Sequence, residues 1–368
     1  MYGYLSVENY YIYQVEGKMN KYIKELDRNI QNYFKILSDE FPEFLYDYIN
    51  TPEMQKQAGI SVSCGTIYSK MYNQMWYSSL DHSVAVALII WNFTKDKKQT
   101  LSGLFHDIAT PVFKHTIDFM NKDYEKQEST EELTTKIISE SKEIMSLLNR
   151  DGIKVEEVAD YHIYPIADND TPMLSSDRLE YTLTNALGAT EKIWRLEDIK
   201  EIYNNIEIGK NEEGIDELCF KDKKIAENFV HTMSILSRLY RREKTVFSMQ
   251  LLADIMKRMS DSNMISINDL YKLSEKEIIE KIENCSDENI KRCFRIWRNA
   301  TEIHKSEEKP TNKYFVSIEK MKVRYINPLV KTSNGYCRLK DLSESAKEDI
   351  EKCMNYRPAK YSYLDFEF

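Results

Sequence analysis

Leu101-Ser102-Gly103-Leu104-Phe105-His106-Asp107 is the stretch that decides the fold, because an apolar run ends there on an adjacent histidine and aspartate. Another histidine lies upstream in Leu80-Asp81-His82-Ser83-Val84. Neighbouring side chains on a helix point about 100° apart, so both members of the pair can reach one metal ion only if other helices supply ligands from the far side. Imidazoles combined with carboxylates suit a divalent metal that activates water and neutralises phosphate. The sequence therefore predicts a metal site completed by His82 and a later aspartate.

Composition limits the class of protein. The chain has 368 residues, of which 42% are hydrophobic, enough for one large core. The longest apolar stretch, Val84 to Trp91, is far shorter than the roughly 20 residues of a membrane span, and the N-terminal region carries polar residues where a signal peptide is apolar. We therefore expect a cytoplasmic protein. A net charge of −9 argues against a nucleic-acid backbone as the main partner and leaves a small anionic ligand open.

The spacing of apolar residues indicates a mainly α fold. Residues 131–149 and 247–259 repeat apolar side chains at three- and four-residue steps, which predicts helices. Residues 205–209 and 215–220 alternate around a polar turn and predict a small β-hairpin.

Further signals mark the C-terminal third. Ser274 and Glu277 have the capping-box form of a helix start. Residues 314–318 and 323–326 are rich in β-formers, and Asn327-Pro328 should stop the run. The polar stretch 304–312 then predicts a division between a helical body, residues 1–305, and a small α+β appendage, residues 306–368.

The order of a histidine, a His-Asp pair and a distant aspartate resembles the HD-domain metal-dependent phosphohydrolases. On that resemblance the ligands are His82, His106, Asp107 and Asp177, within a motif core over residues 77–185 of a helical bundle. The chain is most similar to the deoxynucleoside triphosphate triphosphohydrolase branch, which includes the sterile-alpha-motif/HD and dGTPase-like proteins. Mixed nitrogen and oxygen ligation favours one divalent transition metal, Mn, Fe, Co, Ni or Zn, with Mg as a further candidate.

The same branch suggests further site residues. A second histidine normally follows the His-Asp histidine by nine positions, where His115 stands, and Asp177 begins a segment that resembles the branch in its basic, tyrosine and polar positions. On a helix, Asp177, Tyr181 and Asn185 share one face and can line a pocket. Residues 323–330 are also similar to a segment of related bacterial phosphohydrolases. The roles that follow are proton donation by His115 or Glu128, phosphate binding by Lys114 and Arg178, and substrate contacts from Tyr181 and Asn185.

Three positions depart from the branch. Thr110 stands where a histidine is usual, Gln127 begins what is usually a His-Glu pair, and Ser79 replaces an arginine three residues before the first metal histidine. These positions contact or protonate the triphosphate in the relatives. The departures leave the metal site intact, and a monophosphate or another phosphoester stays open as the substrate.

Several alternatives remain at this point. His82 also fits a core histidine bonded to a backbone carbonyl, and Asp177 also fits a helix cap. The leading function is a metal-dependent phosphohydrolase acting on a nucleotide, with a deoxynucleoside triphosphate among the candidates. A catalytically altered HD protein that binds a nucleotide as a sensor or scaffold is the second, and a cyclic or dinucleotide phosphodiesterase is the third. The expected partners are a small phosphorylated substrate and a second copy of the chain, with no membrane partner.

Overall fold

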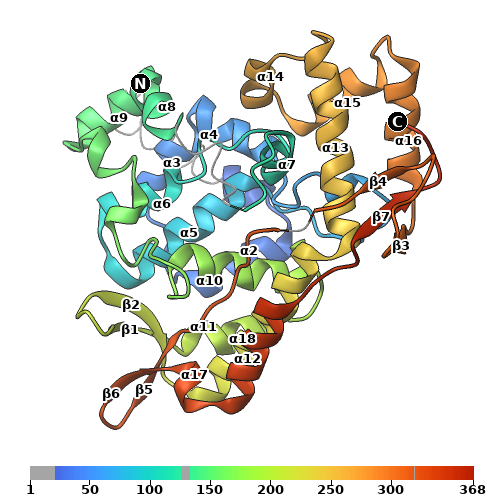
Figure 1. The fold of residues 1–368 in the computed structure, drawn as a ribbon. Helices are drawn as coiled ribbons and strands as arrows, with labels where there is room; N and C mark the ends of the chain where they lie inside the picture. Colours follow the sequence, from blue (N-terminus) through green and yellow to red (C-terminus); the bar gives the residue numbers. More distant parts are fainter. Residues whose placement is uncertain (1–20, 126–132, 319) are drawn as a thin grey trace, which may run out of the picture.

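The structure is a computed structural model that describes residues 21–125, 133–318 and 320–368. Helices dominate these residues, and two small sheets lie at their edge (Figure 1). The helices of the first half are α2 (Arg28–Leu37), α3 (Phe44–Ile49), α4 (Pro52–Lys56), α5 (Ser79–Thr94), α6 (Lys97–Phe105), α7 (His115–Met120), α8 (Thr134–Glu140), α9 (Lys142–Asp151) and α10 (Ser176–Thr184). Those of the second half are α11 (Leu196–Asn204), α12 (Lys223–Arg241), α13 (Glu243–Asp261), α14 (Ile267–Lys272), α15 (Glu275–Glu283), α16 (Glu288–Asn299), α17 (Leu339–Leu342) and α18 (Glu344–Asn355).

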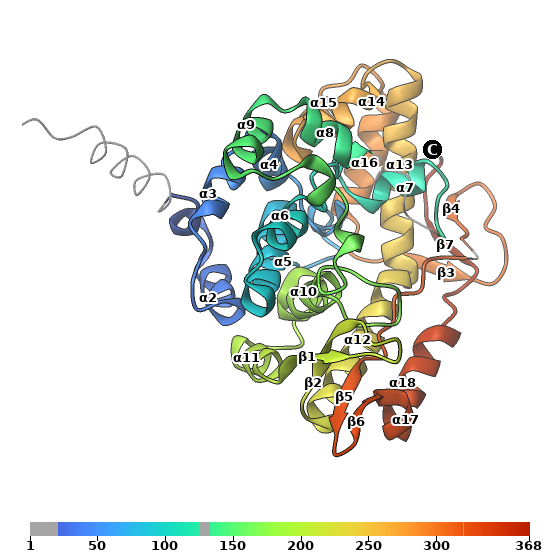
Figure 2. The same cartoon turned by 90° about the vertical axis from the view of Figure 1, so that its left-hand side faces the viewer.

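Helix α5 lies at the centre of the fold and carries His82. Ser78 caps its start in a capping box with Asp81, and residues 79–90 are all buried. A helix that is buried on every side belongs in a core, and α2, α6 and α10 pack around α5 (Figure 2). Helix α6 approaches closely at Gly103, where an added Cβ would lie 2.3 Å from the Cδ1 atom of Ile90. This close packing places His106, immediately after α6, beside α5.

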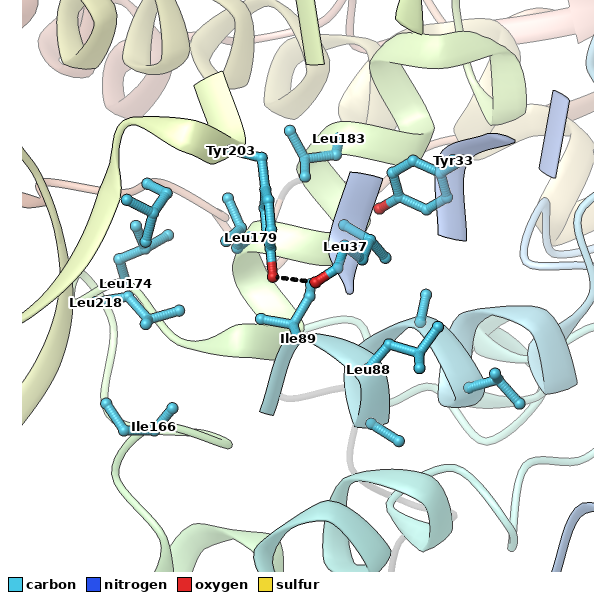
Figure 3. Packing of buried hydrophobic residues seen from close by; sticks show 14 of the residues in the cluster. Tyr33, Leu37, Leu88, Ile89, Ile166, Leu174, Leu179, Leu183, Tyr203 and Leu218 are labelled. Carbon is cyan, nitrogen blue, oxygen red and sulfur yellow. Dashed lines mark hydrogen bonds between the residues drawn. The ribbon is translucent and has the colours of Figure 1, made fainter. Parts of the chain in front are cut away.

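The main hydrophobic core joins α5 to helices that lie far apart in the sequence. Leu88 and Ile89 of α5 pack in the same buried cluster as Leu179 of α10 (Figure 3). The Tyr203 hydroxyl of α11 donates a hydrogen bond of 2.7 Å to the carbonyl oxygen of Leu37 at the end of α2. Helix α2 is therefore tied to α11 as well as to α5.

The predicted hairpin is confirmed. Strands β1 (Ile206–Lys210) and β2 (Asp216–Phe220) pair antiparallel, with Ile206 opposite Phe220. The sheet then continues with strands from much later in the chain. β5 (Leu329–Thr332) pairs parallel to β2, and β6 (Gly335–Arg338) pairs antiparallel to β5, which gives the order β1-β2-β5-β6.

A second sheet has the order β3-β7-β4. Its strands are β3 (His304–Ser306), β4 (Tyr314–Val316) and β7 (Tyr361–Leu364), and both pairings are antiparallel. The residues predicted as the appendage therefore pair with each other and with the helical body, and α18 packs on α12. The division at residues 305 and 306 itself stays a prediction.

One local prediction is wrong. Residues 323–326 form no strand, although their composition is β-rich, because they run past the site and find no neighbouring strand; the strand starts after Pro328 instead. The helical pattern of residues 131–149 is confirmed over the described residues and divides into two helices, because Ser141 ends α8 and caps α9 by accepting a hydrogen bond from the Ile144 amide. Residues 131 and 132 of that prediction lie outside the described residues.

Other local predictions hold. Residues 247–259 lie within α13, and Ser274 caps α15 in a capping box with Glu277. No helix in the described part of the chain is long and apolar enough to cross a membrane.

Candidate metal centre

Three helices bring the four predicted ligands to one point. His82 comes from α5, His106 and Asp107 follow the end of α6, and Asp177 lies in the first turn of α10. The Nε2 atoms of His82 and His106 are 3.1 Å apart. The Asp177 Oδ1 atom lies 3.2 Å from Nε2 of His82 and 3.7 Å from Nε2 of His106. An Asp107 carboxylate oxygen lies within 3.9 Å of each of these nitrogens. The four ligands predicted from the sequence therefore form one cluster.

The outer nitrogen of each histidine has its own acceptor. His106 Nδ1 donates to the carbonyl oxygen of Gly103 at 2.7 Å, and His82 Nδ1 faces a carboxylate oxygen of Glu180. A carbonyl oxygen can only accept, so the proton of neutral His106 lies on Nδ1. With the same tautomer at His82, two lone pairs point at each other across 3.1 Å, which is unfavourable unless a metal ion or a proton lies between them. The donor set and its geometry therefore fit a divalent metal ion.

Electrostatics at the cluster agree with a cation. Burial alone would lower the pKa of His82, but the carboxylates of Glu180 and Asp177 outweigh burial and raise that pKa to about 10. Burial would raise the pKa of Asp177, yet the two imidazoles lower it to about 2. The pKa of Asp107 is likewise held well below its usual range, because Lys114 and the imidazoles outweigh burial. When no metal ion is bound, protons on the imidazoles and the Lys114 ammonium balance the negative charge of the carboxylates.

The structural alternatives for two ligands can now be compared with the geometry. Ser175, not Asp177, caps α10, by accepting from the Arg178 amide. His82 bonds a carboxylate and two ligand-type side chains, and no backbone carbonyl bond is recorded for its ring among the described residues. Both observations favour the ligand interpretation of these residues.

The cluster opens into a cavity of about 490 Å³. All the remaining described candidates from the sequence line it: Lys114, His115, Arg178, Tyr181 and Asn185. Aromatic side chains from several elements line it as well, namely Tyr72, Tyr161, Tyr181 and Tyr240. Glu128 and Gln127 lie outside the described residues, so the predicted role of Glu128 is not placed.

Two of the predicted phosphate cations already have acidic partners. The Lys114 ammonium contacts a carboxylate oxygen of Asp107, and Ser79 lies 3.4 Å from the same oxygen. Arg178 bonds Asp168 at 2.9 Å and the backbone of Asn169. Thr110 lines the cavity wall. A phosphate that enters the cavity would therefore compete with these carboxylates for Lys114 and Arg178.

His115 is held from two sides. Its Nδ1 atom lies 2.9 Å from Oδ2 of Asp118, which is buried on the same helix, and its Nε2 atom faces Nη2 of Arg324 at 3.3 Å. Burial lowers the pKa of His115, and the charges of Arg324 and Lys114 lower it further against the opposing effect of Asp118. His115 is therefore neutral near pH 7, with an acceptor nitrogen turned to the cavity.

Sequence reasoning missed three residues that the fold brings here. Glu180 follows Asp177 by three positions on α10, so its i,i+3 spacing was a signal that could have been used. Asp118 has the same relation to His115. Arg324 had no local signal of this kind, because it reaches the cavity from a segment more than 200 positions away.

Comparison with known proteins agrees with this geometry. Residues 79–190 match the family model of the HD domain, and this range holds all four clustered ligands. The uncharacterized protein YdhJ of Bacillus subtilis is 20% identical over 315 residues, which cover 83% of this chain and 89% of that protein.

Two solved structures share the fold over most of the chain. A hypothetical protein from Aquifex aeolicus superposes with a TM-score of 0.62 at 18% identity, covering 88% of this chain and 93% of that one. A phosphohydrolase from Bacteroides thetaiotaomicron superposes with a TM-score of 0.59 at 13% identity, covering 89% and 97%. The chain thus matches the HD domain over residues 79–190 and shares its overall fold with both solved proteins.

Proposed function

We propose that the protein is a metal-dependent phosphohydrolase acting on a nucleotide or a related phosphoester. The observation that carries the proposal is the convergence of His82, His106, Asp107 and Asp177 at the floor of a cavity whose wall holds several cations. The HD-domain match and the phosphohydrolase among the similar folds support it. A bound divalent ion would supply Lewis acidity and a water of lowered pKa.

The side chains of the cavity have separable tasks. Lys114 contacts Asp107 of the cluster, and Arg324 lines the same cavity beside His115. Both can bind phosphate oxygens, because charge-assisted hydrogen bonds to phosphate are strong. His115, oriented by Asp118, can take up a proton on Nε2 once Arg324 turns to the phosphate, and can pass it to the leaving oxygen. Tyr181 and Asn185 line the same wall and can contact the sugar or base.

A nucleotide-binding sensor is the second candidate. The contact between Lys114 and Asp107 favours it, because the lysine competes with a metal ion for a ligand oxygen. Thr110 lines the wall at the position where the triphosphohydrolase branch that the sequence resembles has a histidine, which favours the same alternative.

The test is a metal assay and a substrate panel. The purified protein would be analysed for bound metal and then incubated with Mn²⁺ and nucleoside mono-, di- and triphosphates, cyclic dinucleotides and simple phosphomonoesters. His106→Ala should lose both metal and turnover. His231→Ala, which removes an exposed imidazole paired with Asp349, should keep both.

Each outcome assigns a function. Release of inorganic phosphate or of triphosphate would identify the bond that is cleaved. Diester cleavage alone would indicate a phosphodiesterase. Tight metal binding with no turnover on the whole panel would contradict the enzyme proposal and support the sensor.

A further inference from the structure

Glu180 is a fully buried carboxylate one turn after Asp177 on α10. In the described part of the chain its recorded ion pair is with His82, and no lysine or arginine is recorded as its partner. A buried carboxylate without a cationic neighbour is costly unless hydrogen bonds and a nearby positive charge stabilise it. The carboxylate therefore needs an explanation beyond packing.

Hydroxyl groups from two other segments fix the carboxylate. The Tyr77 hydroxyl donates to Oε1 of Glu180 at 2.8 Å, and the Tyr33 hydroxyl lies 3.3 Å from the same oxygen. Tyr33 comes from α2 and Tyr77 from the loop that enters α5, and both side chains are fully buried. With Oε1 occupied by the tyrosines, Oε2 is left to face Nδ1 of His82.

We infer that Glu180 is a positioning residue of the metal centre, held by Tyr33 and Tyr77, which keeps the proton of His82 on Nδ1 and turns its Nε2 lone pair toward the ion. The inference rests on the proposed function, in which His82 binds the metal. The second histidine shows the same arrangement with a weaker acceptor, since His106 Nδ1 donates to the neutral carbonyl of Gly103.

The charge balance of the centre agrees with this role. Three carboxylates, those of Asp107, Asp177 and Glu180, stand against one lysine, Lys114, and the remaining two negative charges match a divalent cation. Partners that orient a metal-bound histidine commonly change metal affinity by about 10- to 100-fold when they are removed. Glu180 should therefore act on metal affinity, although it does not touch the ion.

The experiment compares metal affinity among full-length variants. Zn²⁺ and Mn²⁺ affinities would be measured by competition with a chelator for the wild type, Glu180→Gln, Tyr77→Phe and Tyr48→Phe. Tyr48 is the matched control, because its buried hydroxyl donates to Asp151 at 2.7 Å and does not reach Glu180. We expect Glu180→Gln to bind metal about 10- to 100-fold more weakly and Tyr77→Phe about fivefold more weakly. Tyr48→Phe should bind metal like the wild type while its melting temperature falls.

The tautomer of His82 is a second measurement, and a change in packing alone would not alter it. Imidazole ¹⁵N spectra of the metal-free wild type should show the neutral form of His82 protonated at Nδ1, the nitrogen that faces Glu180. In Tyr77→Phe the Nε2-protonated form should increase. Addition of Zn²⁺ to the wild type should shift the His82 Nε2 resonance and leave Nδ1 protonated.

The outcomes separate the two proposals. If the wild type binds no metal, both the proposed function and this inference fail. If the wild type binds metal through His82 but Glu180→Gln and Tyr77→Phe bind it as tightly as Tyr48→Phe, the metal centre stands and the role of Glu180 is overturned. Should Glu180→Gln fail to fold, Tyr77→Phe and the wild-type tautomer decide the matter.

Discussion

The guanidinium of Arg324 lies 3.3 Å from Nε2 of His115, so a residue from the C-terminal segment reaches the side chain proposed to move a proton. Arg324 stands well beyond residues 79–190, the range that matches the HD domain. The C-terminal segment therefore contributes to the cavity that residues 79–190 help to line.

Replacement of Arg324 by glutamine should weaken catalysis without removing metal. One charge-assisted hydrogen bond to a phosphate is worth about 1.5–3 kcal/mol, so kcat/KM should fall about 10- to 100-fold. Metal content should stay at the wild-type level, because Arg324 contacts His115, which is not one of the four predicted ligands. Arg195→Gln, at the exposed arginine that precedes α11, serves as the control. Unchanged kcat/KM in Arg324→Gln would exclude a phosphate contact.

His115→Gln should reveal the proton donor through its dependence on the leaving group. A general acid contributes about 10²–10⁴ to the rate when the leaving oxygen needs a proton, and much less when it does not. We expect a large loss of kcat on a nucleotide and a small loss on a p-nitrophenyl ester. Asp118→Asn should show the same pattern more weakly, because Asp118 orients His115. Equal losses on both substrates would argue against proton donation.

The buried carboxyl group of Glu275 should make the free energy of unfolding depend on pH. It is fully buried at the start of α15, and burial raises its pKa to about 8, although Tyr68 and the Phe113 amide partly stabilise the charged form. Lys56 and Lys114 are the cations that act on it, and burial lowers the pKa of Lys56 to about 7. Because the folded pKa of Glu275 exceeds its unfolded value near 4.5, its stabilising contribution is complete below that pH and is lost as the pH rises toward 8.

Glu275→Gln should remove this dependence. The variant and the wild type should have similar unfolding free energies at pH 5, and the variant should be more stable by on the order of 2–4 kcal/mol at pH 8.5. Urea unfolding at both pH values measures the difference, which also includes the loss of the attraction between Glu275 and Lys56. A constant difference between the two proteins across this range would show that Glu275 does not titrate as described.

Arg338 should stabilise the connection of the C-terminal strands to the hairpin. It bonds Glu217, whose side chain is fully buried in β2, at 2.7 and 2.9 Å, and it bonds the exposed Glu212 as well. Arg338→Met would leave Glu217 charged and unpaired by a cation, at a cost of about 3–5 kcal/mol in the free energy of unfolding. Lys331→Met, which breaks an exposed pair with Glu207, should cost less than about 1 kcal/mol. Similar losses in the two variants would contradict the buried pair.

The sequence by itself determined the features that depend on near neighbours. The hairpin at residues 205–220, the cap at Ser274 and the helix over residues 247–259 follow from turn chemistry, capping and apolar spacing, all of which act within a few residues. The side-chain chemistry of His82, His106 and Asp107 pointed to a metal cluster, and the resemblance to the HD-domain phosphohydrolases added Asp177.

Only the tertiary structure decided which distant side chains meet. Glu180 is held by Tyr33 and Tyr77, which come from other segments. Arg324, from the C-terminal part, contacts His115. Residues 323–326 have the composition of a strand, yet no strand among the described residues lies beside them to pair with. The parallel pairing of β2 with β5 joins segments more than 100 positions apart. Strand pairing and buried polar contacts depend on the partner that the packed core supplies, and local sequence carries no record of that partner.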